Sequence, residues 1–499
     1  TICDRMKTHT HILLCGLAIG WLAACNTFNP VVPNPDTNNP KDSVATNPSD
    51  NPDIPDSSAT TNPSLRNLSY LFDINALPEI TITLTEHDWN TYLSNFDKWE
   101  KNGLYVPASF SFRKGNDEFR RDSVGLRPRG NTSRVRPEGS NGEKHRNGAK
   151  WHHAHFGVKF TEYTTGERFF GCDRLILKWF HEDPAYCREV YSYDLFHRFG
   201  VWSAPYASYC RLSIYIQGDT RPVYMGVYAM IENPRKGWLN DRMKEGHIPD
   251  KTGNMWKASW GADLSNADKS RMGISDDYGN VNPVYDLKTN KAQLADAQQE
   301  LADFINGMTP LPSGSAALKA WLEQHMDVDL FLRAYAVNVI VGMWDDYWIN
   351  QNNYFFYFDT NHRFYFIPFD YDNTLGTSNG INPATQDMLN WGSLGGDRML
   401  MRKVMSINEF RDTYKAYIRQ LATSDDLFAP AGSKARIRQW QTMIAPFVDN
   451  DTGEETHISD APASWSNYPK YRLLTGAVGD GQNAETNFFE TKINSIYWK

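Results

Sequence analysis

Cysteine is scarce in this chain of 499 residues, which contains six, and three of the six lie within the first 25 positions. Further along, the sequence has only Cys172, Cys187 and Cys210. An odd number of thiols cannot all pair within one molecule, so the sequence predicts no disulfide framework, although one bridge is compatible with a location outside the cytoplasm. With 40% hydrophobic and 13% aromatic residues, the chain can instead bury a large core, which we expect to be divided between two lobes.

An excess of positive charge is also missing, because 51 Lys and Arg residues face 59 Asp and Glu residues, for a formal net charge of -8. Basic residues do cluster between Arg113 and Lys150, but Gly, Asn and Glu residues interrupt them, so they do not follow one helical face. Such spacing favours a local anion site over a track for a polymer. The composition therefore argues against a nucleic-acid partner.

The strongly apolar segment near the start, residues 12–24, is too short for a stable membrane span. It follows Lys7 and ends in small residues, which is the pattern of an export signal over residues 6–24. Leu22-Ala23-Ala24-Cys25 resembles the bacterial lipoprotein cleavage box, which predicts cleavage before Cys25 and acylation of its thiol. An ordinary secretory signal with a chance cysteine is the alternative. We expect a lipoprotein anchored in the bacterial cell envelope, at the outer membrane or the cell surface.

Large apolar residues are nearly absent between Val32 and about Arg66, where Pro, Asn, Asp, Ser and Thr dominate. A segment of this composition cannot bury enough apolar surface to fold. Residues 25–66 are therefore expected to form a disordered tether between the anchor and the folded part.

The folded part is expected to combine a strand-rich lobe, residues 67–290, with a mostly helical lobe, residues 291–499. Ile80–Thr85 alternates apolar and polar residues as a half-buried strand does, whereas Cys187–Phe199 has the spacing of an amphipathic helix. These patterns predict an α+β fold. By the same criteria, further strands are predicted at 105–112, 123–128, 155–160, 174–179, 207–217, 223–231, 354–358 and 363–368, and helices at 86–93, 292–308, 316–341 with a break near 327, 407–422 and 433–448.

Acid and amide side chains recur in a compact block, residues 342–353, and again in residues 369–376, with apolar strands between. Loops of this kind between buried elements commonly hold a divalent metal and a phosphate. In phosphoryl transfer the protein positions a nucleotide, holds Mg²⁺ on carboxylate and amide oxygens, and supplies a carboxylate near the attacking hydroxyl. Asp345, Asn353 and Asp370 have that order along the chain. The alternative is that these acids cap a helix end and form a turn.

A second cluster, Gly125–Arg134, places arginines on both sides of a Gly-Asn-Thr-Ser turn. Guanidinium groups and backbone N–H groups suit phosphate oxygens, which makes Arg127 and Arg129 candidate phosphate ligands. Three further residues that could add positive charge are Lys159, Lys178 and Arg188. Candidate partners for such a lysine are Glu189 and Glu232, although structural salt bridges and an outward, solvated Lys159 remain the alternatives.

Two other features invite a binding function. The three histidines at 152, 153 and 155 suggest a metal, but only His153 and His155 share a strand face and no third ligand follows, so zinc is not favoured. The chain also has 16 Trp and 25 Tyr residues, which permits stacking on sugar rings, although most of these aromatics are expected in the core.

Taken in order, the motifs resemble the CotH-type (spore-coat-protein-H-like) atypical kinases. The resemblance covers about Arg127 to Gly376, with the strand at Ile80 as the expected domain start. The blocks that carry it are Arg127-Pro-Arg-Gly-Asn-Thr-Ser-Arg134, Phe156-Gly-Val-Lys-Phe160, Leu177-Lys-Trp179, Asp183-Pro-Ala-Tyr-Cys-Arg-Glu189, Tyr193-Asp-Leu-Phe196, Tyr224-Met-Gly-Val-Tyr228, Ile231-Glu232, Trp344-Asp-Asp-Tyr347, Asn352-Asn-Tyr354 and Phe366-Ile-Pro-Phe-Asp-Tyr-Asp-Asn-Thr-Leu-Gly376.

The resemblance implies a divergent two-lobed protein-kinase-like fold that uses ATP with Mg²⁺ or Mn²⁺ and transfers the γ-phosphate to Ser and Thr hydroxyls of a protein substrate. By position, Asp345 corresponds to the catalytic Asp and Asp370 to the metal-binding Asp. Asn353 and Asp372 would complete the metal or nucleotide site. Candidates for the nucleotide side are Arg127, Arg129, Lys159, Lys178 and Glu232.

A catalytically inactive surface lipoprotein, which binds a glycan or a protein partner, is the second hypothesis. The two hypotheses differ in one geometric expectation. A kinase requires the acidic block and the arginine turn to converge on one cleft, whereas acids that point apart would favour the binding protein.

Overall fold

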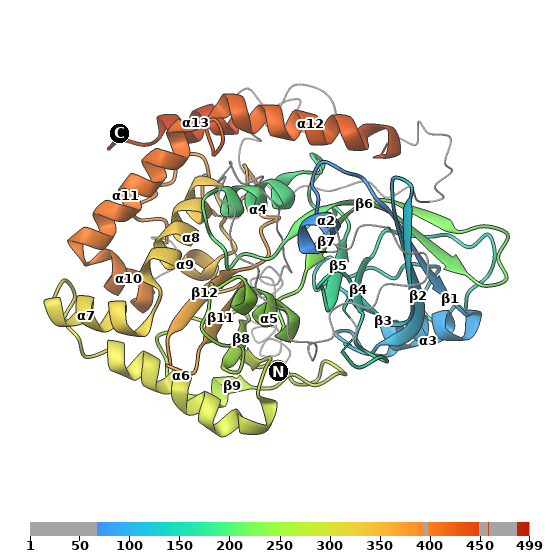
Figure 1. Ribbon diagram of the computed structural model, residues 1–499, viewed down its shortest axis with the longest axis horizontal. Helices are drawn as coiled ribbons and strands as arrows, with labels where there is room; N and C mark the ends of the chain where they lie inside the picture. The colour runs from blue at the N-terminus through green and yellow to red at the C-terminus, as the bar shows by residue number, and fades with distance from the viewer. Residues whose placement is uncertain are drawn as a thin grey trace, which may run out of the picture.

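The computed structural model describes residues 67–166, 168–378, 380–392, 398–448, 458 and 487–498. The predicted signal peptide, Cys25 and the tether lie outside the described residues. The predicted α+β class is confirmed, since two sheets combine with helices that gather mainly on one side of the molecule (Figure 1). Within the described residues, no helix is both long enough and apolar enough to cross a bilayer.

The first sheet closes on itself as a barrel, in the strand order β1-β2-β3-β4-β5-β7-β6. Neighbouring strands are antiparallel except for β1 and β6, whose parallel pairing closes the ring. Large apolar side chains, among them Phe110, Phe156 and Leu177, fill its interior. The strands are β1 (Glu79–Leu84), β2 (Val106–Lys114), β3 (Asp117–Arg129), β4 (His155–Lys159), β5 (Arg174–Lys178), β6 (Ala207–Ile216) and β7 (Val223–Glu232). The helix α2 (Leu68–Leu71) precedes β1, and the helices α3 (Glu86–Lys98) and α4 (Arg188–Arg198) lie between strands in the sequence.

The second sheet has the order β12-β11-β8-β10-β9 and joins strands from both sides of the expected boundary at residue 290. Every residue of β11 and β12 is buried, because helices cover this sheet. Its strands are β8 (Asn254–Ala258), β9 (Met272–Gly273), β10 (Tyr285–Leu287), β11 (Tyr354–Phe358) and β12 (Phe364–Pro368). The remaining helices are α5 (Lys236–Lys244), η2 (Lys269–Arg271), η3 (Lys291–Gln293), α6 (Leu294–Met308), α7 (Ala316–His325), α8 (Val328–Ile340), α9 (Tyr347–Asn350), α10 (Met399–Met405), α11 (Asn408–Thr423), α12 (Pro430–Val448) and α13 (Phe488–Asn494).

The predicted strands and helices are confirmed, although β3 begins at Asp117 rather than at 123 and α3 extends to Lys98 rather than to 93. The predicted break near residue 327 separates α7 from α8, and Asp327 caps α8 by accepting a hydrogen bond from the backbone N–H of Leu330 over 3.0 Å. The sequence did not predict β8, β9, β10 or α5. These elements are short. Of the three strands, β8 pairs with distant β11, β10 pairs with β8, and β9 pairs with β10, so their formation depends on the assembled sheet.

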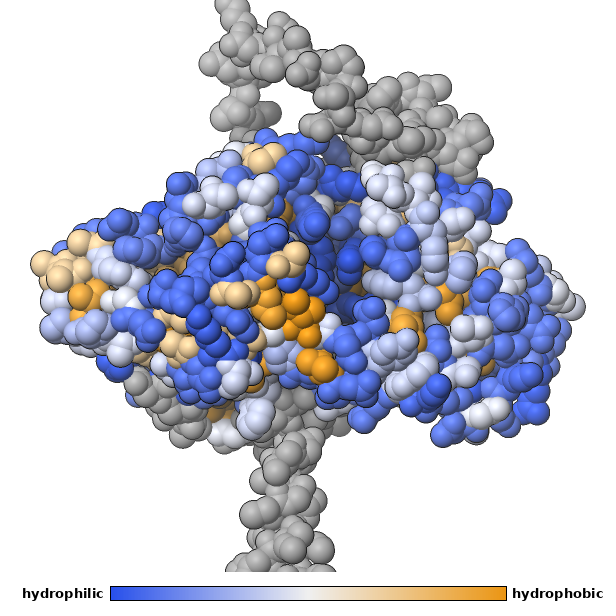
Figure 2. Space-filling model, turned by 90° about the horizontal axis from the view of Figure 1, so that it is seen from below, coloured by the Kyte–Doolittle hydropathy of each residue, from blue (hydrophilic) through white to orange (hydrophobic). Residues whose placement is uncertain are grey.

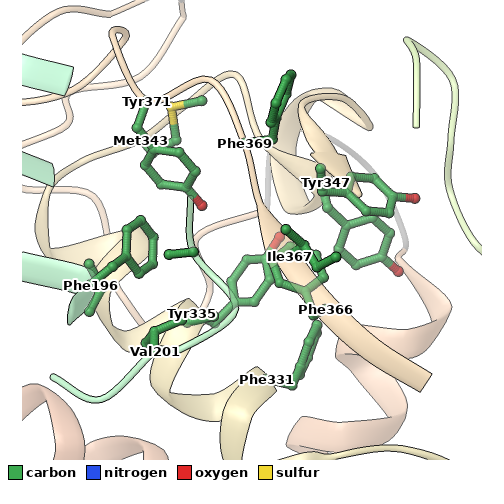
Figure 3. Close-up of a cluster of buried hydrophobic side chains, with 14 of the residues drawn as sticks. Phe196, Val201, Phe331, Tyr335, Met343, Tyr347, Phe366, Ile367, Phe369 and Tyr371 are labelled. Carbon is green, nitrogen blue, oxygen red and sulfur yellow. The ribbon is translucent and has the colours of Figure 1, made fainter. Parts of the chain in front are cut away.

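A cluster of aromatic side chains joins α4, α8 and β12 and fixes the loops that follow them (Figure 3). Phe196 of α4 packs edge-on against Tyr371, with ring centroids 4.8 Å apart. The Tyr371 hydroxyl donates to Oδ1 of Asn338 over 2.8 Å, and Nδ2 of Asn338 donates to Asp346 over 2.7 Å. The core therefore holds the segment after β12 against the loop that follows α8.

Candidate active site

Lys178, the last residue of β5, is buried among three carboxylates from two other parts of the chain. Its Nζ lies 2.6 Å from Oε2 of Glu189, 2.9 Å from Oδ1 of Asp370 and 2.9 Å from Oδ2 of Asp372. Burial alone would lower the pKa of Lys178, but Asp370, Asp372 and Glu189 outweigh it and raise the pKa well above its ordinary value. The lysine is therefore a permanent cation that binds α4 and the segment after β12 to the barrel.

The three carboxylates form a group suited to a divalent cation. One oxygen from each of Glu189, Asp370 and Asp372 lies within 4.8 Å of the others. Burial raises the pKa of Glu189 and of Asp370 well above the ordinary range. Lys178 opposes this rise, and the negative charge of Asp372 adds to it. Oδ2 of Asp370 is buried without a hydrogen-bond partner. Since one ammonium cannot neutralise three carboxylates, the donor set fits Mg²⁺ or Mn²⁺.

Backbone geometry holds Asp370 in this position. Its φ of 70° lies in the left-handed region, which a residue with a Cβ rarely adopts. The following backbone N–H, that of Tyr371, donates to Oε1 of Glu189 over 3.1 Å, so the same glutamate contacts the lysine and the strained turn. Strained backbone of this kind concentrates at functional sites.

Asp345 lies in the loop after α8 and is 1% exposed. Its carboxylate accepts hydrogen bonds from the side-chain amides of Asn350, Asn352 and Asn353, the last over 2.8 Å. Burial raises the pKa of Asp345 to about 7, even though these amides favour the ionised form. A carboxylate of this kind can change its protonation near neutral pH.

Asp346, the next residue, has a structural role. Its carboxylate caps α9, accepting from the backbone N–H of Ile349 over 2.8 Å, and accepts from Asn338. The alternative interpretation of the acidic block as a helix cap thus holds for Asp346. The carboxylate of Asp345 instead accepts hydrogen bonds from the three side-chain amides.

The arginine turn and the acidic block meet at one cavity of about 750 Å³. Arg127 and Arg129 at the end of β3 line it together with Asn353, Phe355 and Phe369. A recess bordered mainly by hydrophilic residues is visible between the two halves of the molecule (Figure 2). Of the acidic block, Asn352 and Asn353 line this cavity, whereas Asp345, Asp370 and Asp372 are not among the residues that line it.

Positive charge dominates the walls of this cavity, although the whole chain is acidic. Among the described residues, ten Lys and Arg side chains and four carboxylates line it. Burial, together with the charges of Arg174 and Arg129, lowers the pKa of Arg235 to about 9. Burial would raise the pKa of Tyr105, yet Arg127 and its basic neighbours reverse the shift and lower the pKa. The cavity therefore suits a polyanion.

The remaining predicted residues occupy different positions. Lys159 lines the cavity and is paired with Glu162. Glu232 does not contact Lys178: the register sets it opposite Leu175 in β5, on the other face of the strand from Lys178, which pairs with Ala229. Its carboxylate accepts instead from Arg242 over 2.8 Å. Glu189, also considered from the sequence, is the glutamate that meets Lys178.

Arg188 is not available as an added phosphate ligand, since its guanidinium donates to Asp183 over 2.6 Å at the start of α4. His153 stacks on Trp179 with ring centroids 4.1 Å apart, and His155 contacts Ser133. The cysteines Cys172, Cys187 and Cys210 are buried, and none of these three forms a disulfide.

Sequence reasoning missed four residues of the site. Asn350 follows Asp345 by five positions, a spacing that a search for an amide partner could have found. Arg174, Arg235 and Lys257 line the cavity but come from separate elements. No local pattern marks them, because only the tertiary fold brings them together.

The fold and the site define a protein with a buried lysine–carboxylate cluster beside a basic cavity. A family model described as CotH kinase protein matches residues 126–473. The chain therefore belongs to the CotH family, as its motifs indicated. It is similar to Spore coat protein homolog 1 of Rhizopus delemar, at 24% identity over 312 residues, which cover 61% of this chain and 47% of that protein. The chain thus spans about half the length of this curated relative.

Proposed function

We propose that this protein is an atypical kinase that transfers the γ-phosphate of ATP to Ser or Thr hydroxyls of a protein substrate. The observation that carries the proposal is the contact of Lys178 with Glu189, Asp370 and Asp372 beside a basic cavity shared with Asn353. Protein kinases depend on a strand lysine paired with a helix glutamate and on a metal-binding aspartate close to both. Here β5, α4 and the segment after β12 supply these three groups.

The same correspondence supports a two-lobed, kinase-like arrangement. The barrel would act as the nucleotide-covering lobe, with the turn between β3 and β4 above the phosphates. The helical part would carry the acceptor-side loop, which contains Asp345. Membership in the CotH family supports this reading of the topology.

In the proposed mechanism Asp345 orients the acceptor hydroxyl and accepts its proton. The amides of Asn350, Asn352 and Asn353 fix the orientation of the carboxylate. With a pKa of about 7, a large fraction of Asp345 is ionised at neutral pH and can act as a base. The carboxylate is also a stronger proton acceptor than one with an ordinary pKa.

Asp370 and Asp372 would hold the divalent cation, with Asn353 as a further oxygen donor. A cation held by these residues would supply positive charge that offsets the charge of the phosphates. Lys178 holds the side chains of Glu189 and Asp370 in place, while Arg127 and Arg129 attract and orient the phosphate chain. Phe355 and Phe369, whose ring centroids lie 4.4 Å apart, line the cavity and would exclude water from it.

We also propose export and lipid anchoring at Cys25, which the lipoprotein box supports. Mass spectrometry of the native chain should detect diacylglyceryl modification of Cys25, and the Cys25→Ser variant should be released from membranes. An unmodified, soluble native chain would contradict the anchor.

The deciding experiment incubates the full chain with γ-labelled ATP and Mg²⁺ or Mn²⁺, scoring label on the protein and on generic acidic and basic substrates. Asp345→Ala should abolish transfer while nucleotide binding survives, and Asp370→Ala should weaken metal-dependent binding. Asp412→Ala, on the exposed face of α11, serves as the control. Undiminished transfer in both site variants would refute the assignments. No label and no thermal stabilisation by nucleotide would leave the inactive glycan- or protein-binding lipoprotein as the better account.

A further inference from the structure

A second cavity, of about 1250 Å³, lies against α5 and is larger than the cavity beside the arginine turn. This α5 cavity is lined by Lys236, Asn240 and Lys244 of α5, by Lys291 of η3 and by Phe170 of the segment before β5. The three α5 residues recur every four positions, so they share one face of the helix. Sites for small molecules commonly span about 300–1,000 Å³, so the α5 cavity has room for a stretch of polypeptide.

Positive charge dominates the α5 cavity. In the described part of the chain, eight Lys and Arg side chains and three carboxylates line it. One of the carboxylates, Asp241, is already paired with Arg168. Lys236, Lys244 and Lys291 are exposed, and none of them forms an ion pair with another described residue. These three ammonium groups are therefore available to a ligand.

The α5 cavity and the cavity beside the arginine turn border the same basic side chains. All five described residues that line both cavities are basic, namely Lys159, Arg174, Arg235, Lys288 and Lys291. Burial lowers the pKa of Lys288 well below its ordinary value, and the charge of Arg235 adds to this shift while Asp286 opposes it. Cations held this close repel one another, so an anion beside them is favoured.

The aromatic residues of the α5 cavity argue for a polypeptide rather than a nucleic acid. Proteins that bind single-stranded nucleic acids stack the bases on accessible aromatic rings. Among the described residues, the aromatic ones that line the cavity are Phe170, which is 3% exposed, and Tyr206. The ring of Tyr206 stacks on His197 and on Phe72, with centroids 4.7 Å and 6.1 Å away. Separated cations without a stacking platform suit acidic side chains spaced along a peptide.

We propose that the α5 cavity binds an acidic segment of the protein that this chain phosphorylates. That this partner is the phosphate acceptor rests on the proposed kinase function, whereas binding of the acidic segment does not. Lys236 and Lys244 would contact the carboxylates of the segment. The shared basic side chains would hold the segment next to the cavity beside the arginine turn.

The test measures binding of a labelled peptide of alternating Glu and Ser to the full chain by fluorescence anisotropy, without nucleotide. Peptides with Gln or Lys in place of Glu, and an oligothymidylate of equal charge, are the comparison ligands. The double variant Lys236→Gln/Lys244→Gln should bind the Glu-Ser peptide about fivefold more weakly, because two charge pairs are lost. It should bind Mg-ATP as the wild type does, since neither lysine lines the other cavity. Lys319→Gln/Lys415→Gln, on α7 and α11, removes the same charge and should change neither affinity.

Phosphoryl transfer to the same peptide gives a second measurement. In the Lys236→Gln/Lys244→Gln variant, KM for the Glu-Ser peptide should rise about fivefold while kcat stays unchanged, because uniform binding is lost and the chemical step is not affected.

The outcomes separate this inference from the kinase proposal. Equal binding of the Glu-Ser and Gln-Ser peptides, or an equal loss in the two double variants, would overturn the inference and leave the kinase proposal standing. Oligothymidylate that binds as tightly as the Glu-Ser peptide would overturn it in favour of a nucleic acid. Weaker Mg-ATP binding by Lys236→Gln/Lys244→Gln would overturn it in favour of the nucleotide. Charge-dependent peptide binding without any transfer by the wild type would overturn the kinase proposal and keep the acidic segment as the ligand of the α5 cavity.

Discussion

Lys178 shows how a single residue can organise a site that spans three segments of the chain. Its ammonium is the counter-charge for Glu189, Asp370 and Asp372, which are themselves packed closely enough to repel one another. Buried charges of this kind are stable only while every partner is present.

Replacing this lysine therefore tests the cation site independently of catalysis. Lys178→Met should lower the free energy of unfolding by about 3–5 kcal/mol without metal, because three buried carboxylates lose their partner. Mg²⁺ should restore more stability to the variant than it adds to the wild type, as urea unfolding with and without Mg²⁺ would measure. Lys319→Met, which breaks a surface pair with Glu323, should have a much smaller effect on the free energy of unfolding. Equal responses to Mg²⁺ would argue against a cation at this cluster.

A second prediction for a single residue concerns Asp345 and the pH dependence of phosphoryl transfer. Its pKa of about 7 means that the carboxylate is protonated, and unable to accept a proton, below that pH. The rate of transfer should rise with pH through about 7 and then level off, as kcat/KM profiles would record. Asp345→Asn should reduce kcat by about 10²-fold or more and remove this limb from any residual activity. A wild-type profile that is flat between pH 5.5 and 8.5 would contradict the role.

Among the elements, α9 is a short helix that depends on one buried cap. Asp346 accepts from Ile349 at its first turn and from Asn338 in α8, so it links the loop to the helix before it. Burial raises the pKa of Asp346 from an ordinary 3.8 to about 7. The cap therefore titrates near neutrality in the folded protein.

Stability should consequently depend on pH through this element. Between about pH 4 and 7 the folded protein holds a proton on Asp346 that the unfolded chain has released. For this group the free energy of unfolding falls as pH rises through that window, by up to ~1.4 kcal/mol per pH unit. Asp346→Asn should flatten the slope, whatever its effect on absolute stability, whereas Asp412→Asn should not. Urea unfolding at a series of pH values measures it, and an unchanged slope would count against the assignment.

At the scale of the whole molecule, charge is distributed unevenly. The chain carries a net charge of -8, yet in the described part of the chain ten Lys and Arg side chains and four carboxylates line the cavity beside the arginine turn. A basic recess in a chain of net negative charge directs polyanions to one place.

The affinity for nucleotide should accordingly fall as salt rises, because ions screen the cavity charges. Mg-ATP should bind several-fold more weakly at 300 mM NaCl than at 50 mM NaCl, as calorimetry would show. Arg127→Gln should weaken binding and reduce this salt dependence, whereas Arg411→Gln on α11 should do neither. Salt-independent binding would place the nucleotide elsewhere.

Sequence patterns identified most of the local structure. Apolar alternation at Ile80–Thr85 and helical spacing at Cys187–Phe199 are local signals, and β1 and α4 follow them closely. The candidate acids Asp345 and Asp370 were also evident from the sequence, because each lies in a polar run between strongly apolar elements. A local pattern suffices when the property it encodes, such as burial of one face, is decided within a few residues.

What only the tertiary structure decided is pairing across long distances. Parallel contact of β1 with β6 closes the barrel, and β8 joins β11 across about a hundred residues. The choice of Glu189 over Glu232 as the partner of Lys178 likewise depends on strand register, since one face of β5 looks toward α4 and the other does not. The sequence by itself determined which residues can be charged and which segments can form strands or helices. Packing decided which of those charges meet, because proximity between distant segments is a property of the folded core and not of any single stretch of chain.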